Sequence, residues 1–348
     1  MSASIPLPKN FAPAAVADVE NRLAARWQAP GSAGNGAVHA CTLNLIACVE
    51  DANDTAAVSD VVGRLAATHP IRAITIVTEE SADPNQIRAW IGSNPAGGSA
   101  GQISSEEIAL LAQTDDTEPL VATVEGMLAA DLPVYFWWRG GSPTGDHTFA
   151  ALARLADKII VDSIRFGDAA AALDTIRGLL AMRAGRAGVS DLNWIRTAPW
   201  RESIAACFDD AAVLALLPHM NRASINYYAS GSTGALAPSA RALLLSHWLT
   251  NRVPRLRGRV RIKPVAGATA GIGRVVKVSL SSATSPTALE LERVDDPVGV
   301  AAVAKNDSGE ILRAWTFPAE TLSEAELMHR SIEAPARDPV LEAALRTD

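Results

Sequence analysis

The stretch Ala40-Cys-Thr-Leu-Asn-Leu-Ile-Ala-Cys-Val49 is an apolar run of strand length, and the segments around it indicate the architecture of the first half of the chain. The next segment, Thr55–Thr68, carries valines and leucines at helical spacing. A second short apolar run, Ala73–Thr78 (AITIVT), is typical of a strand buried on both faces of a parallel sheet. Residues 40–78 therefore predict a β-α-β unit.

The same alternation of strands and helices continues to about residue 190. Further strands are predicted at Glu107–Leu111, Pro133–Trp138 and Lys158–Asp162, and further helices at Leu120–Ala130, Phe149–Leu155 and Ala169–Met182. Because strands separated by helices form right-handed crossovers, this order predicts a mostly parallel sheet flanked by helices. We expect this α/β domain to cover residues 36–190, after an N-terminal helical arm at residues 1–35.

The second half of the chain has a different pattern. From Arg259 onward, short runs of alternating polarity replace the strand–helix rhythm and predict an antiparallel meander with one solvated face. The other predicted features are a strand at Ala223–Ala229, a helix at Pro238–Thr250, a capping box at Thr321–Glu324 and a helix start at Asp338-Pro339. These features together predict an α+β domain over residues 191–348.

Composition and charge exclude several classes of protein. Of the 348 residues, 48% are hydrophobic and 20% are charged, which excludes general disorder. The net charge of −7 argues against nucleic acids and acidic membranes as partners. No stretch approaches the ~20 apolar residues of a membrane span, and the N-terminus has no secretory pattern, so a cytoplasmic location is expected.

Residue types that carry catalysis or hold metals form no recognisable set. The six histidines are scattered along the chain. A G-x-S-x-G match at Gly97–Gly101 follows a helix-like stretch, Asn85–Ile91, whereas a nucleophile elbow needs a strand before it and a helix after it. Cys41 and Cys48 lie at an odd separation in one predicted strand, so their thiols point to opposite faces. We therefore expect no catalytic residue, no metal and no cofactor.

Two segments carry chemistry that suits an anion. The loop Ala229–Pro238 (ASGSTGALAP) lies between a predicted strand and a predicted helix, so its free N–H groups could bind a phosphate or a carboxylate. The alternative is an ordinary loop in which Ser and Thr cap the helix. The basic run Asn251–Lys263 fits a solvated edge strand or a patch that binds a sugar phosphate or an acidic protein face. The candidate anion-binding residues are Ser230, Ser232, Thr233, Arg255, Arg257 and Arg259. A sugar-phosphate-binding sensor or enzyme is therefore one interpretation of the chain.

Two tryptophan-rich segments are the most unusual part of the sequence. Asp131–Gly140 (DLPVYFWWRG) places two indoles at the carboxyl end of a predicted central strand, and Asp191–Glu202 (DLNWIRTAPWRE) combines Trp with Arg. Trp and Arg are typical anchors of protein interfaces. The alternative for the first segment is that both rings belong to the core. In the second segment the alternative is that the Trp residues pack the joint between the domains, while the Arg residues pair across it or bind an anion. The candidate partner-binding residues are Trp137, Trp138, Arg139, Gly140, Trp194, Arg196, Trp200 and Arg201.

These two segments, with Asp157–Ser163 (DKIIVDS) between them, resemble the glucose-6-phosphate dehydrogenase assembly protein family, OpcA. Their order and spacing match the family over residues 36–260. The resemblance implies a non-enzymatic protein that binds glucose-6-phosphate dehydrogenase and favours its active oligomeric form as an allosteric activator. It also implies a role in glucose metabolism, at the entry to the oxidative pentose phosphate pathway. Self-association of the chain is left open.

Overall fold

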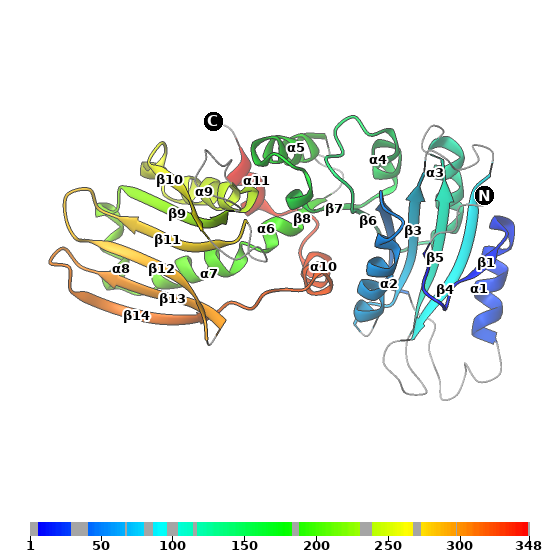
Figure 1. Ribbon diagram of the computed structural model, residues 1–348, viewed down its shortest axis with the longest axis horizontal. Coiled ribbons are helices and arrows are strands. Elements are labelled where there is room, and N and C mark those ends of the chain that lie inside the picture. Colours follow the sequence, from blue (N-terminus) through cyan, green and yellow to red (C-terminus); the bar gives the residue numbers. More distant parts are fainter. Residues whose placement is uncertain are drawn as a thin grey trace. The chain divides into compact units, whose positions relative to one another are not determined.

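The computed structural model describes residues 6–28, 41–66, 68–79, 86–95, 104–113, 117–182, 188–229, 239–266, 273–296 and 298–346. The chain forms two compact units, and each unit is assembled from separate stretches of sequence (Figure 1). Unit 1 consists of Met1–Asp162, Met182–Ser190 and Ser323–Arg337, and unit 2 consists of Ser163–Ala181, Asp191–Leu322 and Asp338–Asp348. A segment close to the C-terminus therefore belongs to the unit that the N-terminal half of the chain builds.

Unit 1 is built on an eight-stranded sheet, sheet A, with the strand order β1-β4-β5-β3-β2-β6-β7-β8. The strands are β1 (Ala12–Ala14), β2 (Leu43–Val49), β3 (Ile71–Thr78), β4 (Arg88–Pro95), β5 (Ser104–Ala112), β6 (Val134–Trp138), β7 (Lys158–Val161) and β8 (Gly188–Asp191). The pairs formed by β5, β3, β2, β6 and β7 are parallel, and β4 and β1 add antiparallel strands at one edge. The order from β5 to β8 is that of a doubly wound, Rossmann-type sheet. The predicted mostly parallel sheet is confirmed.

Helices cover sheet A because its strands are apolar on both faces. All residues of β2 are buried, and α2 packs against β2 and β3 (Figure 1). The helical segments of unit 1 are η1 (Val16–Asp18), α1 (Val19–Gln28), α2 (Asp54–Leu65), α3 (Thr117–Met127), α4 (His147–Leu152), η2 (Ala153–Leu155) and α10 (Glu324–Glu333). The start of the chain differs from the expected arm, because β1 pairs with β4 and Val19 and Leu23 are buried.

Two local predictions for unit 1 are wrong. The stretch Asn85–Ile91 is expected to be helical, but its residues from Arg88 onward belong to strand β4, because Trp90 and Ile91 pair with β5 in an antiparallel ladder. The capping box of α10 begins at Ser323 and not at Thr321. The Ser323 hydroxyl accepts from the main-chain N–H of Glu326 at 3.3 Å, and Glu326 Oε2 accepts from the Ser323 N–H at 2.6 Å.

Unit 2 is built on a six-stranded sheet, sheet B, with the order β10-β9-β11-β12-β13-β14 (Figure 1). Its strands are β9 (Arg222–Ala229), β10 (Val260–Ala266), β11 (Val275–Ser281), β12 (Ala288–Asp295), β13 (Val298–Lys305) and β14 (Ile311–Pro318). The strands β11 to β14 form the predicted antiparallel meander, whereas β10 pairs with β9 in parallel. One face of the meander is buried, through side chains such as Leu289, Leu291 and Val300.

Three helices of unit 2 contact sheet B among the described residues: α7 and α8 contact β14, and α9 contacts β9 and β10, while α11 packs on α9. The helical segments are η3 (Ser163–Arg165), α5 (Ala169–Met182), α6 (Leu192–Ile195), α7 (Ala198–Cys207), α8 (Ala211–Leu214), η4 (Leu217–His219), α9 (Ala240–Arg252), η5 (Pro254–Leu256) and α11 (Pro339–Leu345). As predicted, α11 starts at Asp338-Pro339, and the Asp338 carboxylate accepts from the main-chain N–H of Val340 at 2.9 Å. Across the described residues, every helix is too short or too polar to cross a membrane.

Candidate functional site

An open α/β sheet binds its ligand beyond the carboxyl ends of its strands, at the point where the strand order reverses. In sheet A this point lies between the parallel strands β2 and β6. The chain leaves β2 at Glu50 and leaves β6 at Arg139, whose main-chain N–H donates to the Cys48 carbonyl at 2.9 Å. We call the place between these two strand ends the switch crevice.

The turn between β2 and α2, Glu50-Asp-Ala-Asn-Asp54, contains three carboxylates and no glycine. A dinucleotide-binding turn uses glycines to bring backbone N–H groups to a pyrophosphate at a helix N-terminus. Carboxylates repel a pyrophosphate, and at this helix start the Asp51 Oδ1 already accepts from the Asn53 N–H at 2.8 Å. The residues of the turn therefore do not fit a nicotinamide dinucleotide.

Arg139 fills the switch crevice from the end of β6. Its side chain is 6% exposed and donates two hydrogen bonds to Glu324 of α10, from Nε to Oε1 at 3.1 Å and from Nη2 to Oε2 at 3.0 Å. It also forms an ion pair with Asp54 of α2. Burial lowers the pKa of the Arg139 guanidinium, but the hydrogen bonds to Glu324 and Asp54 outweigh it and raise the pKa above its ordinary value. The crevice is thus closed by side chains from three elements of unit 1.

Gly140 follows Arg139 because the backbone approaches Glu50 closely at this point. A Cβ at position 140 would lie 2.5 Å from Glu50 Oε1. The same Glu50 oxygen accepts from the Gly141 N–H at 3.1 Å, and the Gly141 carbonyl accepts from the Trp138 indole N–H at 2.9 Å. The absence of a side chain at Gly140 therefore leaves room for the Glu50 carboxylate, which Gly141 binds beside the end of β6.

The tandem indoles at the end of β6 lie in the interior of unit 1. Trp137 is 0% exposed and Trp138 is 2% exposed. The Trp138 ring meets Phe149 edge to face, with centroids 5.4 Å apart, and packs beside Phe136. Helices cover both faces of sheet A, so the alternation along β6 sends both rings into the core. The expected docking role of Trp137, Trp138, Arg139 and Gly140 is corrected, because the chain does not present these residues at its surface.

The second tryptophan-rich segment also packs inside a unit. Trp194 is buried, and its indole N–H donates to Asp338 Oδ2 at 2.7 Å. The Arg201 guanidinium carbon lies 3.7 Å from the centroid of the Trp194 ring, and burial lowers the pKa of Arg201 to about 10. Trp200 is 4% exposed. Trp194, Trp200 and Arg201 therefore stabilise unit 2 and form no exposed docking surface.

Four arginines converge in unit 2 on a cavity of about 160 Å³, which we call the arginine pocket. Its lining residues are Arg196, Pro199, Trp200, Arg241, Arg274, Arg293, Ala319, Glu320, Thr321 and Leu322. Four arginines and one acidic residue, Glu320, line the cavity. Arg293 also forms an ion pair with Asp295 at 3.7 Å, and burial, followed by Arg274, lowers the pKa of Arg293. Guanidinium groups in this number suit a phosphate or carboxylate anion. The cavity volume suits the anionic group of a ligand.

Residues of the sequence motifs position one of these arginines. Asp191 is 0% exposed and accepts from the Ser163 N–H at 2.9 Å and from the Ser163 hydroxyl at 2.8 Å. The Asn193 amide donates to the same hydroxyl at 3.1 Å, and the Asn193 Oδ1 accepts from Arg241 Nε at 3.2 Å. The Asp-Ser and Asp-Leu-x-Trp segments thus act together to orient Arg241 toward the pocket.

Among the expected anion-binding residues, the structure describes three, and it does not gather them in one hollow. Ser230, Ser232 and Thr233 lie outside the described residues. The side chains of Arg255, Arg257 and Arg259 are exposed. Arg257 lines a hollow beside α9 and α11, and Arg259 lines a different one on sheet B. The basic run is divided among the end of α9, η5 and the start of β10, so it is not one edge strand.

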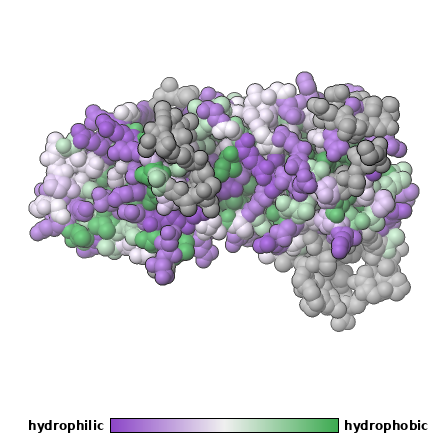
Figure 2. Space-filling model, viewed as in Figure 1, coloured by the Kyte–Doolittle hydropathy of each residue, from purple (hydrophilic) through white to green (hydrophobic). Residues whose placement is uncertain are grey.

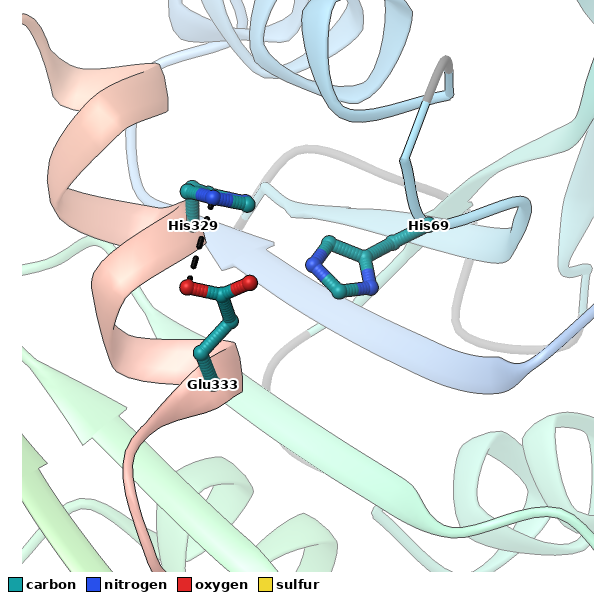
Figure 3. A group of neighbouring side chains, drawn as sticks. All are labelled: His69, His329 and Glu333. Atoms are coloured by element: carbon teal, nitrogen blue, oxygen red, sulfur yellow. Dashed lines mark ion pairs between the residues drawn. The ribbon is translucent and has the colours of Figure 1, made fainter.

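The cysteines are free thiols within the described part of the chain. Cys41 lies before the start of β2 and is half-buried, and burial raises its pKa to about 11. Cys48 is fully buried inside β2, and burial raises its pKa as well. Among the described residues, the side chains that bring metal-ligating atoms together are His69, His329 and Glu333, which the sequence did not reveal (Figure 3).

Two family models, one for each terminal domain of a glucose-6-phosphate dehydrogenase subunit, match the chain. The N-terminal domain of that family matches residues 62–178, and its C-terminal domain matches residues 187–345. Two similar curated proteins are both named "Putative OxPP cycle protein OpcA". The one from Nostoc punctiforme is 29% identical over 153 residues, 43% of this chain and 30% of its own length. The one from Synechocystis is 27% identical over 198 residues, 56% of this chain and 39% of its own length. The chain thus matches less than half the length of these relatives.

Among solved structures, the fold resembles that of an NAD-binding oxidoreductase from Klebsiella pneumoniae. The TM-score is 0.50 at 12% sequence identity, and the match covers 88% of this chain and 94% of the other. At this identity the likeness concerns the fold alone. It agrees with the Rossmann-type strand order of sheet A.

Proposed function

Since the chain belongs to the OpcA family of glucose-6-phosphate dehydrogenase subunits, we propose that it is a non-catalytic partner of that dehydrogenase. In this role it binds the enzyme, favours the active oligomeric form and acts in the oxidative pentose phosphate pathway. For this effect, the chain must bind the active form of the dehydrogenase more tightly than the inactive form. A preference of about 1–3 kcal/mol for the active form shifts its population about 5- to 150-fold.

The observation that carries this proposal is the switch crevice. Sheet A has the strand order of a dinucleotide-binding fold, yet its turn is acidic and lacks glycine. The Arg139 ion pairs with Glu324 and Asp54 close the same place from inside the chain. A sheet with this strand order, whose turn does not fit a nicotinamide dinucleotide, supports a binding role better than a hydride-transfer role.

We place the docking surface on strand β14, the last strand of sheet B among those described. An edge strand leaves one row of backbone N–H and C=O groups available for pairing. On this strand Ile311 is 64% exposed, and the rings of Trp315 and Phe317 stack with centroids 6.5 Å apart. Figure 2 shows hydrophobic side chains at the surface in the region of β14. The apolar edge fits a protein partner.

The test is to measure dehydrogenase velocity against glucose 6-phosphate with and without the chain, and to run the mixture on gel filtration. We expect a co-eluting complex and a change in maximal velocity or in half-saturating substrate. Ile311→Glu should weaken the effect about tenfold, whereas Met182→Glu, at a position 56% exposed on α5, should not. The proposal fails if the wild-type chain changes neither kinetic parameter and forms no complex.

The arginine pocket favours a second candidate function, a sensor of a phosphorylated sugar. Arg196, Arg241, Arg274 and Arg293 supply the positive charge for a phosphate monoester or a sugar acid. Isothermal titration of the chain alone with glucose 6-phosphate and 6-phosphogluconate tests this function, with Arg274→Ala as the pocket variant. Saturable binding that the variant loses favours the sensor, and binding that needs the dehydrogenase favours the assembly role.

A further inference from the structure

Three metal-ligating side chains from two separate stretches of sequence converge in unit 1 (Figure 3). His69 comes from the turn between α2 and β3, and His329 and Glu333 come from α10. Their ligand atoms all lie within 4.8 Å of one another, and the two imidazole centroids are 5.1 Å apart. We propose that His69, His329 and Glu333 bind a divalent transition-metal ion of the zinc class.

The backbone holds the three side chains in position. His329 and Glu333 are four residues apart on one face of α10, with Nε2 and Oε2 3.4 Å apart. The buried Lys158 ammonium fixes the end of this helix, since it donates to the carbonyls of Ser331, Ala334 and Pro335. The main-chain N–H of His69 donates to the Leu65 carbonyl at 2.7 Å, and this hydrogen bond closes the turn that carries His69. The site is therefore largely preformed.

The imidazole of His69 carries a nitrogen that is suited to a metal ion. Its Nε2 atom is buried and has no hydrogen-bond partner among the described residues. A buried polar atom without a partner is costly, and an imidazole nitrogen is a common metal ligand. Figure 3 shows the His69 ring pointing toward His329 and Glu333. A metal ion between the three groups would satisfy the Nε2 atom.

The distances are close to those that a tetrahedral ion needs. Zinc binds imidazole nitrogen and carboxylate oxygen at about 2.0–2.2 Å, so the ligand atoms should lie about 3.3–3.5 Å apart. Side-chain rotation can close the remaining gap, because His329 and Glu333 are 35% and 58% exposed. Two imidazoles and one carboxylate suit zinc, cobalt or nickel better than magnesium or calcium. Water would complete the coordination from the exposed side.

Binding would join α10, which lies near the end of the sequence, to the turn between α2 and β3. Because the ligands are assembled only in the folded unit, an ion bound there stabilises the folded state. The site uses residues of unit 1 and the proposed docking surface uses residues of unit 2, so a failure of the metal proposal would leave the proposed function untouched. Its success would give the protein a metal-dependent stability that the family match does not imply.

The experiment is a titration of the metal-free chain with Co²⁺, followed by visible absorption and then by displacement with Zn²⁺. Equilibrium dialysis with Zn²⁺ gives the stoichiometry, and thermal unfolding gives the stabilisation. We expect one ion per chain, tetrahedral Co²⁺ absorption and a higher midpoint of unfolding with Zn²⁺. His69→Ala and His329→Ala should each weaken binding at least tenfold.

Two further variants keep the test decisive. Glu333→Gln preserves the size of the side chain and removes the charged ligand, so it should weaken binding while the metal-free chain unfolds at an unchanged temperature. His219→Ala removes an exposed histidine of unit 2 and should leave binding unchanged. The proposal is overturned if the wild-type chain binds no Zn²⁺ at micromolar concentration. It is equally overturned if His69→Ala and Glu333→Gln retain full affinity, or if His219→Ala lowers it as much as they do.

Discussion

Replacing Arg139 by Met tests whether the ion pairs in the switch crevice hold unit 1 together. The substitution keeps an unbranched side chain in the core and removes the guanidinium. It breaks two hydrogen bonds to Glu324 and the ion pair with Asp54. We expect the free energy of unfolding to fall without a change of fold.

The exposure of the partners sets the size of this loss. Removing one partner of a fully buried pair costs about 3–5 kcal/mol, and an exposed pair is worth about 0–1 kcal/mol. Arg139 is 6% exposed, whereas Glu324 and Asp54 are 26% and 29% exposed and can be partly rehydrated. Glu324 also begins α10, where the helix dipole favours a carboxylate without any partner. We therefore expect a loss of about 2–3 kcal/mol.

Urea denaturation followed by tryptophan fluorescence measures this loss, since Trp137 and Trp138 lie beside Arg139. The cycle of Arg139→Met, Glu324→Gln and the double variant isolates the pair, and a coupling of about 1 kcal/mol is expected. A loss below about 0.5 kcal/mol, with no coupling, would refute the reasoning. NADPH fluorescence should show no binding to the variant either, because the acidic turn remains. Cofactor binding gained by Arg139→Met would contradict the argument from that turn.

Three further outcomes follow from single side chains. Lys158→Met should lower the free energy of unfolding by about 2–3 kcal/mol in urea, because the buried ammonium donates to three carbonyls at the end of α10. Burial, and then Arg177, lower the pKa of His247, so unfolded chains bind more protons. Stability should therefore be complete above pH ~6.5 and fall as the pH drops through the lower folded pKa, with a flatter profile for His247→Gln. Iodoacetamide should modify the half-buried Cys41 before the fully buried Cys48, as read by mass spectrometry of the native protein.

The sequence predicts the parallel sheet well because the signal is local. Strands β2 and β3 are apolar on both faces, and only a sheet covered on both sides can bury them. Strand β4 is different, because its identity depends on the antiparallel ladder with β5 and not on its own residues. The short strands β1 and β8 carry no signal of their own for the same reason, since pairing partners define them.

The role of the candidate site residues likewise depends on the folded structure and not on the local sequence. Tandem tryptophans at a strand end are compatible with an interface and with a core, and only the helices over both faces of sheet A decide for the core. The arginine pocket could not be predicted, because Arg196, Arg241, Arg274 and Arg293 come from separate segments and meet only in the folded unit. The one local signal was the Asp191–Asn193 stretch, whose carboxylate and amide orient Arg241.

Helix α10 connects the switch crevice of unit 1 with the proposed metal site. Its first residue, Glu324, closes the switch crevice through Arg139, and its last turns carry His329 and Glu333. A helix of ten residues transmits position along its axis, so an ion bound at one end would hold the other end against the crevice. Conversely, loss of the Glu324 pair should loosen the helix and weaken the metal site. A segment that returns from the far end of the sequence therefore sets both the closed crevice and the arrangement of the metal ligands.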